Sequence, residues 1–230
     1  MDFGYIEKNL YTLLNDIEVL AAGLGVAAPK LVAVTKSGSD EELLALIRAG
    51  AYAIGENRPG ELARRGALIK EAGLSAELHQ IGTLQSNKAK LVAPCASVIH
   101  SLDSLSLARE LDKQGKRLGI KIPALIEINS AREPQKKGVL PEDAERFISS
   151  LSEYEGIKVT GLMTMGPASL DPENSRPYFK LTRELFDKLN SRYGFGDTPT
   201  LSMGMSGSYR VAIEEGSTLV RVGRRLFIKE

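Results

Sequence analysis

The sequence has few of the residues that build disulfides and metal centres. Its 230 residues include one cysteine, Cys95, two histidines and no tryptophan. A single cysteine cannot form an internal disulfide, and one cysteine with two histidines falls short of the four ligands of a typical zinc site. A globular chain of this length buries about 70% of its unfolded surface, so we expect it to fold without either kind of cross-link.

Long apolar runs and an excess of one charge are also missing. No stretch approaches about 20 apolar residues, so no membrane-spanning helix is predicted. The N-terminal segment carries charges at short intervals, unlike a secretory signal peptide. We therefore expect a cytoplasmic protein without membrane contacts. Thirty basic and 29 acidic side chains give a net charge of +1, which does not favour a nucleic-acid partner.

What the chain does contain is a regular alternation of short β-rich runs with longer amphipathic segments. The predicted strands are 31–35, 51–54, 77–81, 97–101, 122–128, 158–163, 200–202 and 218–222. The predicted helices are 5–22, 40–49, 57–72, 86–92, 104–118, 141–151, 175–193 and 207–214. Eight β/α units of this size predict an α/β fold, a TIM-type (β/α)8 barrel in a single domain over residues 1–230.

Two details refine the predicted architecture. Only a short segment follows the eighth strand, so the extra N-terminal helix is expected to take the place of the eighth helix. The competing architecture is an open, doubly wound sheet, which more often has a glycine-rich phosphate turn after its first strand. Here that strand runs into Thr35-Lys36-Ser37-Gly38, which matches neither common phosphate-loop pattern.

In such a barrel, functional side chains lie where the strands end and the βα loops begin. Lys36 follows the apolar run LVAVT, and a lysine buried at the end of such a run would be desolvated. Desolvation lowers the pKa of an amine and favours the neutral form, which attacks carbonyl groups. The alternative is a lysine whose stem leaves the strand and whose charged end reaches solvent.

The loop after the seventh predicted strand, SMGMSGS at 202–208, combines hydroxyl groups with glycine backbone N–H groups. Such donors suit a phosphate, and barrels often bind phosphate between the loops after strands seven and eight. The alternative is a tight turn that only needs small residues. The candidate phosphate-binding residues are Ser202, Met203, Gly204, Ser206, Gly223 and Arg224.

Other polar residues have two open interpretations each. Arg221 lies inside the last strand and needs a partner, either a cofactor ring nitrogen or a neighbouring carboxylate such as Glu127. His79 and His100 are more typical of hydrogen-bonded core groups than of catalytic ones. Asn57 is a candidate cap of the helix that it opens.

The remaining residues of interest have simpler expectations. Met163 and Met203 are expected in the wall of the site. The basic pair Arg64-Arg65 is expected on the solvated surface. Tyr209 is the only tyrosine that we place near the rim.

Seven segments together resemble the pyridoxal 5'-phosphate homeostasis protein family, the single-domain relatives of the alanine racemase barrel. They are LVAVTK at 31–36, IGENR at 54–58, HQIGTLQSNKAKLV at 79–92, SLDSLSLARELD at 101–112, GLMTMGP at 161–167, LSMGMS at 201–206 and TLVRVGRRLF at 218–227. The segments occur in the family order across nearly the whole chain. The combination of IGxLQxNK, LSMGMS and a following RVG is specific.

The resemblance implies a barrel of pyridoxal phosphate fold type III. Lys36 would hold pyridoxal phosphate as an internal aldimine, the loop at 202–206 and the turn at 223–224 would bind its phosphate, and Arg221 would face the pyridine nitrogen. Three further residues match positions around the cofactor ring: Asn57, His79 and Met163. The implied function is a carrier that buffers and supplies intracellular pyridoxal phosphate with little or no catalysis, and the implied partners are pyridoxal-phosphate-dependent apo-enzymes.

The sequence departs from the family pattern at two places. Gly207 and Ser208 stand where an acidic residue commonly follows the MGMS serine, so any role of that carboxylate is absent. Arg224 stands where a small hydroxyl residue often follows the RxG triplet. An arginine there either contacts the phosphate or turns outward and leaves binding to backbone N–H groups.

Two other functions remain as alternatives. An amino-acid racemase of the alanine racemase type needs a second base opposite the lysine, often a tyrosine from another domain, and no β-rich second domain is expected here. A barrel that binds a phosphorylated metabolite without covalent chemistry would use Lys36 as a phosphate or carboxylate contact. We expect a monomer or a weak dimer.

Overall fold

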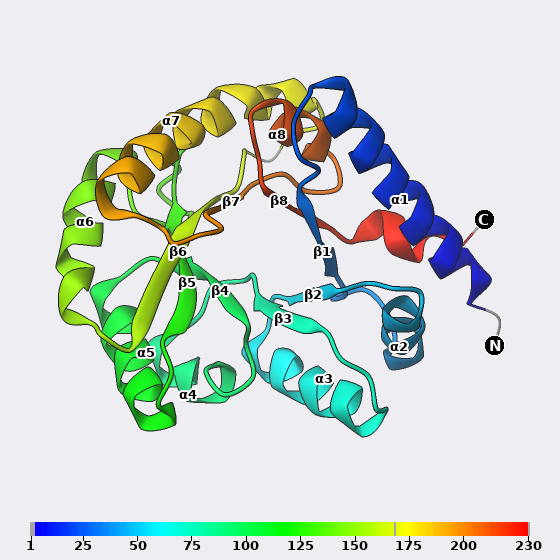
Figure 1. Cartoon of the computed structure of the whole chain (residues 1–230), viewed down its shortest axis with the longest axis horizontal. Coiled ribbons are helices and arrows are strands. Elements are labelled where there is room, and N and C mark those ends of the chain that lie inside the picture. The colour runs from blue at the N-terminus through cyan, green and yellow to red at the C-terminus, as the bar shows by residue number, and fades with distance from the viewer. Residues whose placement is uncertain (1–2, 168, 230) are drawn as a thin grey trace.

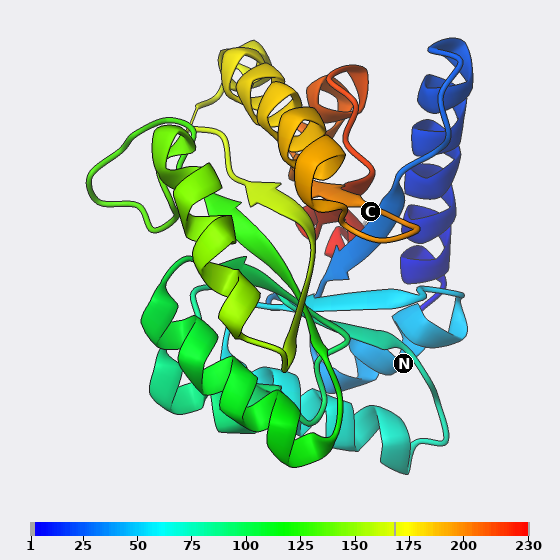
Figure 2. The same cartoon turned by 60° about the vertical axis from the view of Figure 1, so that its left-hand side comes forward.

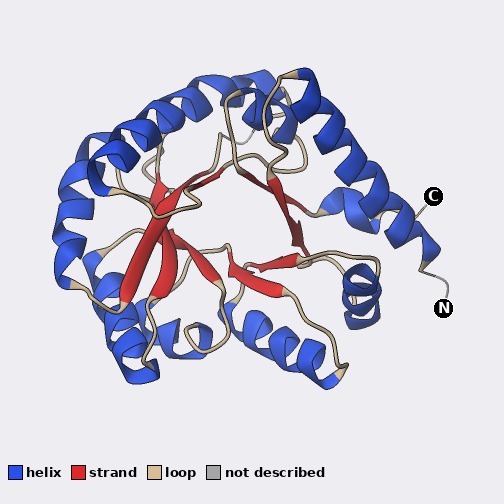
Figure 3. Ribbon diagram, viewed as in Figure 1, coloured by secondary structure: helices blue, strands red, loops and turns tan. Residues whose placement is uncertain are grey.

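The computed structural model describes residues 3–167 and 169–229. Within these ranges, eight parallel strands close into a barrel in sequence order (Figures 1 and 3). The strands are β1 (Lys30–Val34), β2 (Ala53–Glu56), β3 (Glu77–Gln80), β4 (Val98–Leu102), β5 (Ile122–Ile128), β6 (Ile157–Thr164), β7 (Thr200–Ser202) and β8 (Leu219–Val222). The predicted barrel is confirmed, and each predicted strand overlaps an observed one.

Helices cover the outer face of the barrel, as the two views in Figures 1 and 2 show. They are α1 (Gly4–Gly23), α2 (Asp40–Arg48), α3 (Pro59–Glu71), α4 (Ala89–Val92), α5 (Leu105–Leu118), α6 (Ala144–Ser150), α7 (Arg176–Tyr193) and α8 (Tyr209–Glu214). A short 3-10 helix, η5 (Arg224–Phe227), follows β8. None of the helices in the described part of the chain is long and apolar enough to span a membrane.

Helix α1 fills the position that an eighth outer helix would take, as expected from the sequence. It runs beside β1 and η5 in Figure 1. The amide of Asn9 donates hydrogen bonds to the carbonyl oxygens of Leu226 (3.4 Å) and Ile228 (2.9 Å). One face of α1 is buried at helical spacing, at Ile6, Leu10, Leu13, Ile17 and Ala21. The first helix and the last turn therefore cover the seam between β1 and β8 together.

The strands alternate between an outward and an inward face, with a period of two residues. Outward residues form a large apolar cluster with the helices, for example Ala33 and Val220. Inward residues such as Val32 and Leu219 form a separate, smaller cluster inside the barrel. Polar side chains share this inward face, because a hydrogen bond joins His100 of β4 to Ser202 of β7, two strands that are not neighbours.

Helix α3 begins two residues later than predicted. Pro59 is its first residue, and Arg58 before it has an extended backbone. Proline suits the first turn of a helix because its missing N–H needs no partner there, and it keeps the preceding residue out of the helical conformation. The interpretation of Asn57 as the cap of this helix is therefore wrong.

Candidate functional site

Three loops that carry predicted site residues lie side by side at the carboxyl ends of the strands. Strand β8 pairs with β1 on one side and with β7 on the other. The backbone N–H of Gly223, just after β8, donates to Ser206 Oγ in the loop after β7 (3.2 Å). A Cβ at Gly223 would lie 2.7 Å from the carbonyl oxygen of Val34 at the end of β1. The structure thus places the ends of β1, β7 and β8 against one another.

Lys36 lies in a turn just beyond β1 and is exposed, whereas Thr35 before it is fully buried. Of the two interpretations of Lys36, the exposed position agrees with a charged end in solvent and not with a desolvated amine. The buried run ends at Thr35, because β1 stops at Val34 and Lys36 lies in the turn that follows. The Lys36 amine is therefore accessible from solvent at the rim.

A buried arginine holds the turn that carries Lys36. Arg65 of α3 donates to the carbonyl oxygens of Thr35 (2.7 Å) and Gly38 (2.6 Å), on either side of Lys36. It also forms an ion pair with Glu56 at the end of β2, whose carboxylate accepts the Thr35 hydroxyl. Arg65 is 5% exposed and Glu56 is 2% exposed. This network connects β1, β2 and α3 directly beneath the lysine.

The prediction that Arg64-Arg65 lies on the solvated surface is right for Arg64 and wrong for Arg65. Arg64 is exposed and binds two acidic side chains at the surface. Arg65 shares the buried face of α3 with Leu62 and Ile69, which are spaced at helical intervals around it. That spacing is a signal from which the sequence could have predicted a buried arginine.

The loop after β7 has the tight geometry that its glycine indicates. Gly204 has φ +91°, and a Cβ there would lie 2.5 Å from Ala212 Cβ and 2.9 Å from Tyr209 Cα in α8. The backbone N–H groups of Ser206 and Gly207 donate to no residue that the structure describes. The loop therefore offers free donors beside the Ser206 hydroxyl.

The other residues of the predicted phosphate site take different positions. Met203 is buried in the cluster between strands and helices, so its side chain faces away from the barrel interior. Ser202 is fully buried inside the barrel. Arg224 is exposed and forms no ion pair within residues 3–167 and 169–229. Of the predicted phosphate-binding residues, Ser206 and the backbone N–H groups thus remain as polar groups in the loops after β7 and β8, and Arg224 is exposed beside them.

Arg221 crosses the barrel interior, 4% exposed, and is held by neutral acceptors. It donates to the carbonyl oxygen of Thr164 on β6 (3.0 Å) and to Ser202 Oγ on β7. It makes no ion-pair contact with Glu127, the carboxylate considered as its partner. Burial lowers the pKa of Arg221 to about 10, and the longer-range attraction of Glu127 opposes that effect. The guanidinium therefore stays charged at neutral pH.

Both histidines lie inside the barrel with both ring nitrogens hydrogen-bonded. His79 contacts Glu77 and His100, and His100 contacts His79 and Ser202. The interpretation of both as hydrogen-bonded core groups is confirmed. Met163 is 1% exposed and pairs in register with Glu127 of β5. Asn57 is exposed on the rim, where its carbonyl oxygen accepts from Gln80 Nε2 (2.9 Å).

Glu127 is a buried carboxylate that the sequence did not single out as a site residue. It is 3% exposed, and its Oε2 has no hydrogen-bond partner in the described ranges. Burial and the charge of Asp103 raise the pKa of Glu127 to about 7, although Arg221 and Lys137 favour the charged form. The interior thus holds a carboxyl group that titrates near neutral pH.

We expect Glu127→Gln to change the pH dependence of stability. The pKa rises from 4.5 to about 7 on folding, so the folded state holds this proton more tightly than the unfolded state. The resulting stability is fully present below about pH 4.5 and is lost as the pH rises through about 7. At about pH 8 the variant should be more stable than the wild type by up to about 3 kcal/mol, and at about pH 4 the two should be similar. Urea denaturation at both pH values measures this, and an equal difference at both would contradict the raised pKa.

Tyr209, the tyrosine considered as a second base, does not face the barrel interior. It is buried between α8, α1 and η5, where its hydroxyl donates to Asp16 and accepts a hydrogen bond from Arg225 (3.0 Å). Burial and the hydrogen bond to Asp16 raise the pKa of this hydroxyl. The structure therefore gives no support to Tyr209 as a base opposite Lys36.

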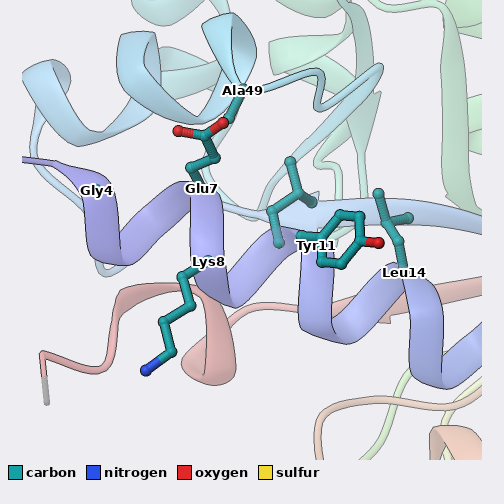
Figure 4. A pocket seen from close by; sticks show the side chains of 7 residues that line it. Gly4, Glu7, Lys8, Tyr11, Leu14 and Ala49 are labelled. Atoms are coloured by element: carbon teal, nitrogen blue, oxygen red, sulfur yellow. The ribbon is translucent and has the colours of Figure 1, made fainter.

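A groove on the outside of the barrel is separate from this rim. It lies between α1 and the end of α2, has a volume of about 380 Å³, and is lined by Tyr11, Leu14 and Ala49 among others (Figure 4). Its walls come from the outer helices, so none of the candidate site residues contributes to it.

Comparisons with known proteins agree with this geometry. The alanine racemase N-terminal domain family matches residues 9–229. A pyridoxal phosphate homeostasis protein of Aquifex aeolicus is 40% identical over 206 residues, which cover 90% of this chain and 89% of that protein. A solved structure of an unknown protein from Bifidobacterium adolescentis has 33% identity and a TM-score of 0.89, and the match covers 99% of this chain and 97% of the other.

PipY of Synechococcus elongatus has been solved both without and with pyridoxal phosphate. The two structures match with TM-scores of 0.86 and 0.83 and identities of 29% and 28%, over 97% of this chain and 100% of theirs. The chain belongs to the pyridoxal phosphate homeostasis protein family, within the larger group that shares the alanine racemase N-terminal domain.

Proposed function

We propose that the protein binds pyridoxal phosphate at the rim formed by β1, β7 and β8, and that it holds and supplies this cofactor in the cytoplasm with little or no catalysis. The observation that carries the proposal is an accessible lysine, Lys36, at the end of β1 beside the serine-glycine loops after β7 and β8. The family membership and the cofactor-bound structure of PipY support the same ligand.

The residues at the rim fit this cofactor. Its phosphate needs several hydrogen-bond donors in a small space, and the loop offers the Ser206 hydroxyl and the free N–H groups of Ser206 and Gly207. The close approach of Gly223 to Val34 leaves no room for a side chain there, so backbone alone faces the loop. Pyridoxal phosphate supplies an aldehyde that condenses reversibly with a primary amine and releases one water molecule. In this proposal Lys36 provides that amine.

The environment of the two cationic residues favours a carrier over a catalyst. Because Lys36 is exposed, water can reach a bond formed on its amine, and a reversible carrier needs such release. Arg221 stays charged, and in the proposed site it faces the pyridine nitrogen. A permanently charged partner keeps that nitrogen unprotonated, which weakens the electron-withdrawing power that racemisation requires.

The proposal extends to the partners of the protein. We propose that pyridoxal-phosphate-dependent apo-enzymes receive the cofactor and that the carrier acts as a monomer or a weak dimer. Lys36, Asn57 and Arg224 are all exposed on one chain, so the rim is accessible without a second copy. Light scattering on the samples described next reports the oligomeric state, and a stable higher oligomer would contradict this part.

The central test is Lys36→Ala. The wild type should gain a visible absorption band on addition of pyridoxal phosphate, and borohydride should fix the cofactor to the peptide that contains Lys36. The variant should show neither signal, because it lacks the amine. Lys121→Ala is the matched control, since Lys121 is an exposed lysine just before β5 at the opposite end of the barrel. No band in the wild type would sink the proposal, and phosphate binding without a band would favour a non-covalent phosphometabolite site.

A further inference from the structure

A continuous chain of hydrogen bonds crosses the barrel interior from one end toward the candidate site. It begins at Glu77, the first residue of β3, whose carboxylate contacts His79 Nε2 (3.3 Å). His79 Nδ1 contacts His100 Nε2 (2.8 Å), and His100 Nδ1 contacts Ser202 Oγ (3.1 Å). Arg221 donates to the same Ser202 oxygen. Four strands therefore contribute to one chain that ends at Arg221.

The two ends of the chain fix the direction of its first and last hydrogen bonds. Hydrogen bonds from His79 and Tyr52 lower the pKa of Glu77 to about 2 despite its partial burial, so its carboxylate is ionised and accepts from His79. At the other end, an arginine can only donate, so Ser202 Oγ accepts from Arg221. Burial, the largest cause, lowers the pKa of His100 well below its usual value, so its ring carries a single N–H.

If the His79 ring carries a single N–H, one arrangement satisfies every link. Its N–H is on Nε2 and points to Glu77, so its Nδ1 is bare and accepts from His100 Nε2. His100 Nδ1 is then bare as well and accepts the hydroxyl proton of Ser202. The Ser202 oxygen keeps its lone pairs free for Arg221. Every donor in the chain then points the same way, from Arg221 toward Glu77.

The orientation of the Arg221 guanidinium depends on this arrangement, because few groups around it accept its hydrogen bonds. Within the described residues its guanidinium donates to Ser202 Oγ and to the Thr164 carbonyl oxygen, and no carboxylate contacts it. A hydroxyl group can rotate about its C–O bond. The lone pairs of Ser202 Oγ therefore point at Arg221 only while the hydroxyl donates its hydrogen bond to His100. The carbonyl oxygen of Thr164 alone leaves a long, flexible side chain with a single anchor.

We propose that His100, supported by His79, is a positioning residue that orients Arg221 through Ser202. The chain fixes the guanidinium across the barrel before any ligand binds. The consequence for pyridoxal phosphate rests on the function proposed above, in which Arg221 meets the cofactor ring. The hydrogen-bond pattern itself does not depend on that function.

The first test observes the pattern directly in the protein without ligand. Only two histidines are present in the sequence, so long-range 1H–15N spectra of protein labelled at histidine nitrogen contain two imidazole patterns. His79→Gln assigns them by removing one. At neutral pH both rings should carry hydrogen on Nε2 and none on Nδ1. Hydrogen on Nδ1 of His100, or a doubly protonated ring at His79, would overturn the proposal.

The second test separates a positioning role from a general structural one. His100→Leu removes the acceptor for Ser202, and the affinity for pyridoxal phosphate should fall roughly tenfold, as expected when a buried polar group loses its partner. His100→Gln keeps one donor and one acceptor and should restore most of the affinity. The affinity for inorganic phosphate should stay at the wild-type value in both variants, because the loops after β7 and β8 bind it without Arg221.

Other combinations of the two affinities would reject the positioning role of His100. A parallel loss of phosphate and pyridoxal phosphate binding in His100→Leu, or no loss of either, would reject the positioning role. If His100→Leu does not fold, Ser202→Ala breaks the same link with a smaller change, and its pyridoxal phosphate affinity should fall without a loss of phosphate affinity. A wild type that binds no pyridoxal phosphate would reject the proposed function, whereas the imidazole spectra would still decide the hydrogen-bond pattern.

Discussion

Replacing Arg65 by methionine should lower the free energy of unfolding by about 3–5 kcal/mol, because it leaves the Glu56 carboxylate buried without a cation. The carbonyl oxygens of Thr35 and Gly38 lose the hydrogen bonds that Arg65 donates in the same variant, although Thr35 keeps the one from the Gly38 N–H. The turn that presents Lys36 then loses its attachment to α3, so pyridoxal phosphate binding should weaken as well. Urea denaturation measures the first effect, and titration with the cofactor measures the second.

The neighbouring arginine provides the matched control for this prediction. Arg64 is exposed, and it pairs with Asp40 and Glu61 at the surface. Surface pairs contribute about 0–1 kcal/mol, so Arg64→Met should stay within about 1 kcal/mol of the wild type and bind the cofactor normally. Replacing both members of the buried pair, Glu56→Leu with Arg65→Met, should be less harmful than Arg65→Met alone. Equal effects of the Arg64 and Arg65 variants would contradict the role assigned to Arg65.

Gly204→Ala is the second substitution for which we expect a large effect. The backbone at Gly204 has φ +91°, and the new Cβ would lie 2.5 Å from Ala212 Cβ and 2.9 Å from Tyr209 Cα. The unfavourable conformation and the overpacking each cost about 1–3 kcal/mol, so the loop and α8 must shift apart. A shift there displaces Ser206 from Gly223, and we expect weaker binding of both inorganic phosphate and pyridoxal phosphate.

Gly207→Ala in the same loop separates this effect from a general intolerance to alanine. No atom lies within 4 Å of a Cβ at Gly207, and its φ lies outside the left-handed range. Its stability should therefore stay within about 0.5 kcal/mol of the wild type, as for most surface substitutions. Thermal unfolding of both variants makes the comparison. If the two glycine variants unfold at the same temperature, the packing of Gly204 against α8 is not the constraint described here.

The barrel was predictable because its signals are local. Each strand is a short β-rich run, and each helix has an apolar face at helical spacing, so the order of elements could be read along the chain. The place of α1 followed from the short segment after β8. Helix starts were less predictable where proline decides them, as at Pro59.

The sequence predicted which positions along the chain carry the candidate site, but not which distant residues contact one another there. The strand ends indicated where Lys36, Ser206 and Gly223 meet, because parallel strands place their carboxyl ends on one rim. The sequence left the exposure of Lys36 open between two interpretations, since it depends on where β1 stops. The pairing of Arg65 with Glu56, and the contact of His100 with Ser202, join residues far apart in sequence. No local pattern encodes the partner in such pairs.

The closure of the barrel has a consequence for how the chain is made. Strand β1 pairs with β8, the last strand of the chain, so its outer edge has no partner while residues 219–222 are still inside the ribosome. Unpaired apolar strand edges invite association with other chains. If the earlier strands pair before β8 is made, two edges of the sheet stay free, those of β1 and β7. We therefore expect slow completion of the last residues to increase the association of nascent chains.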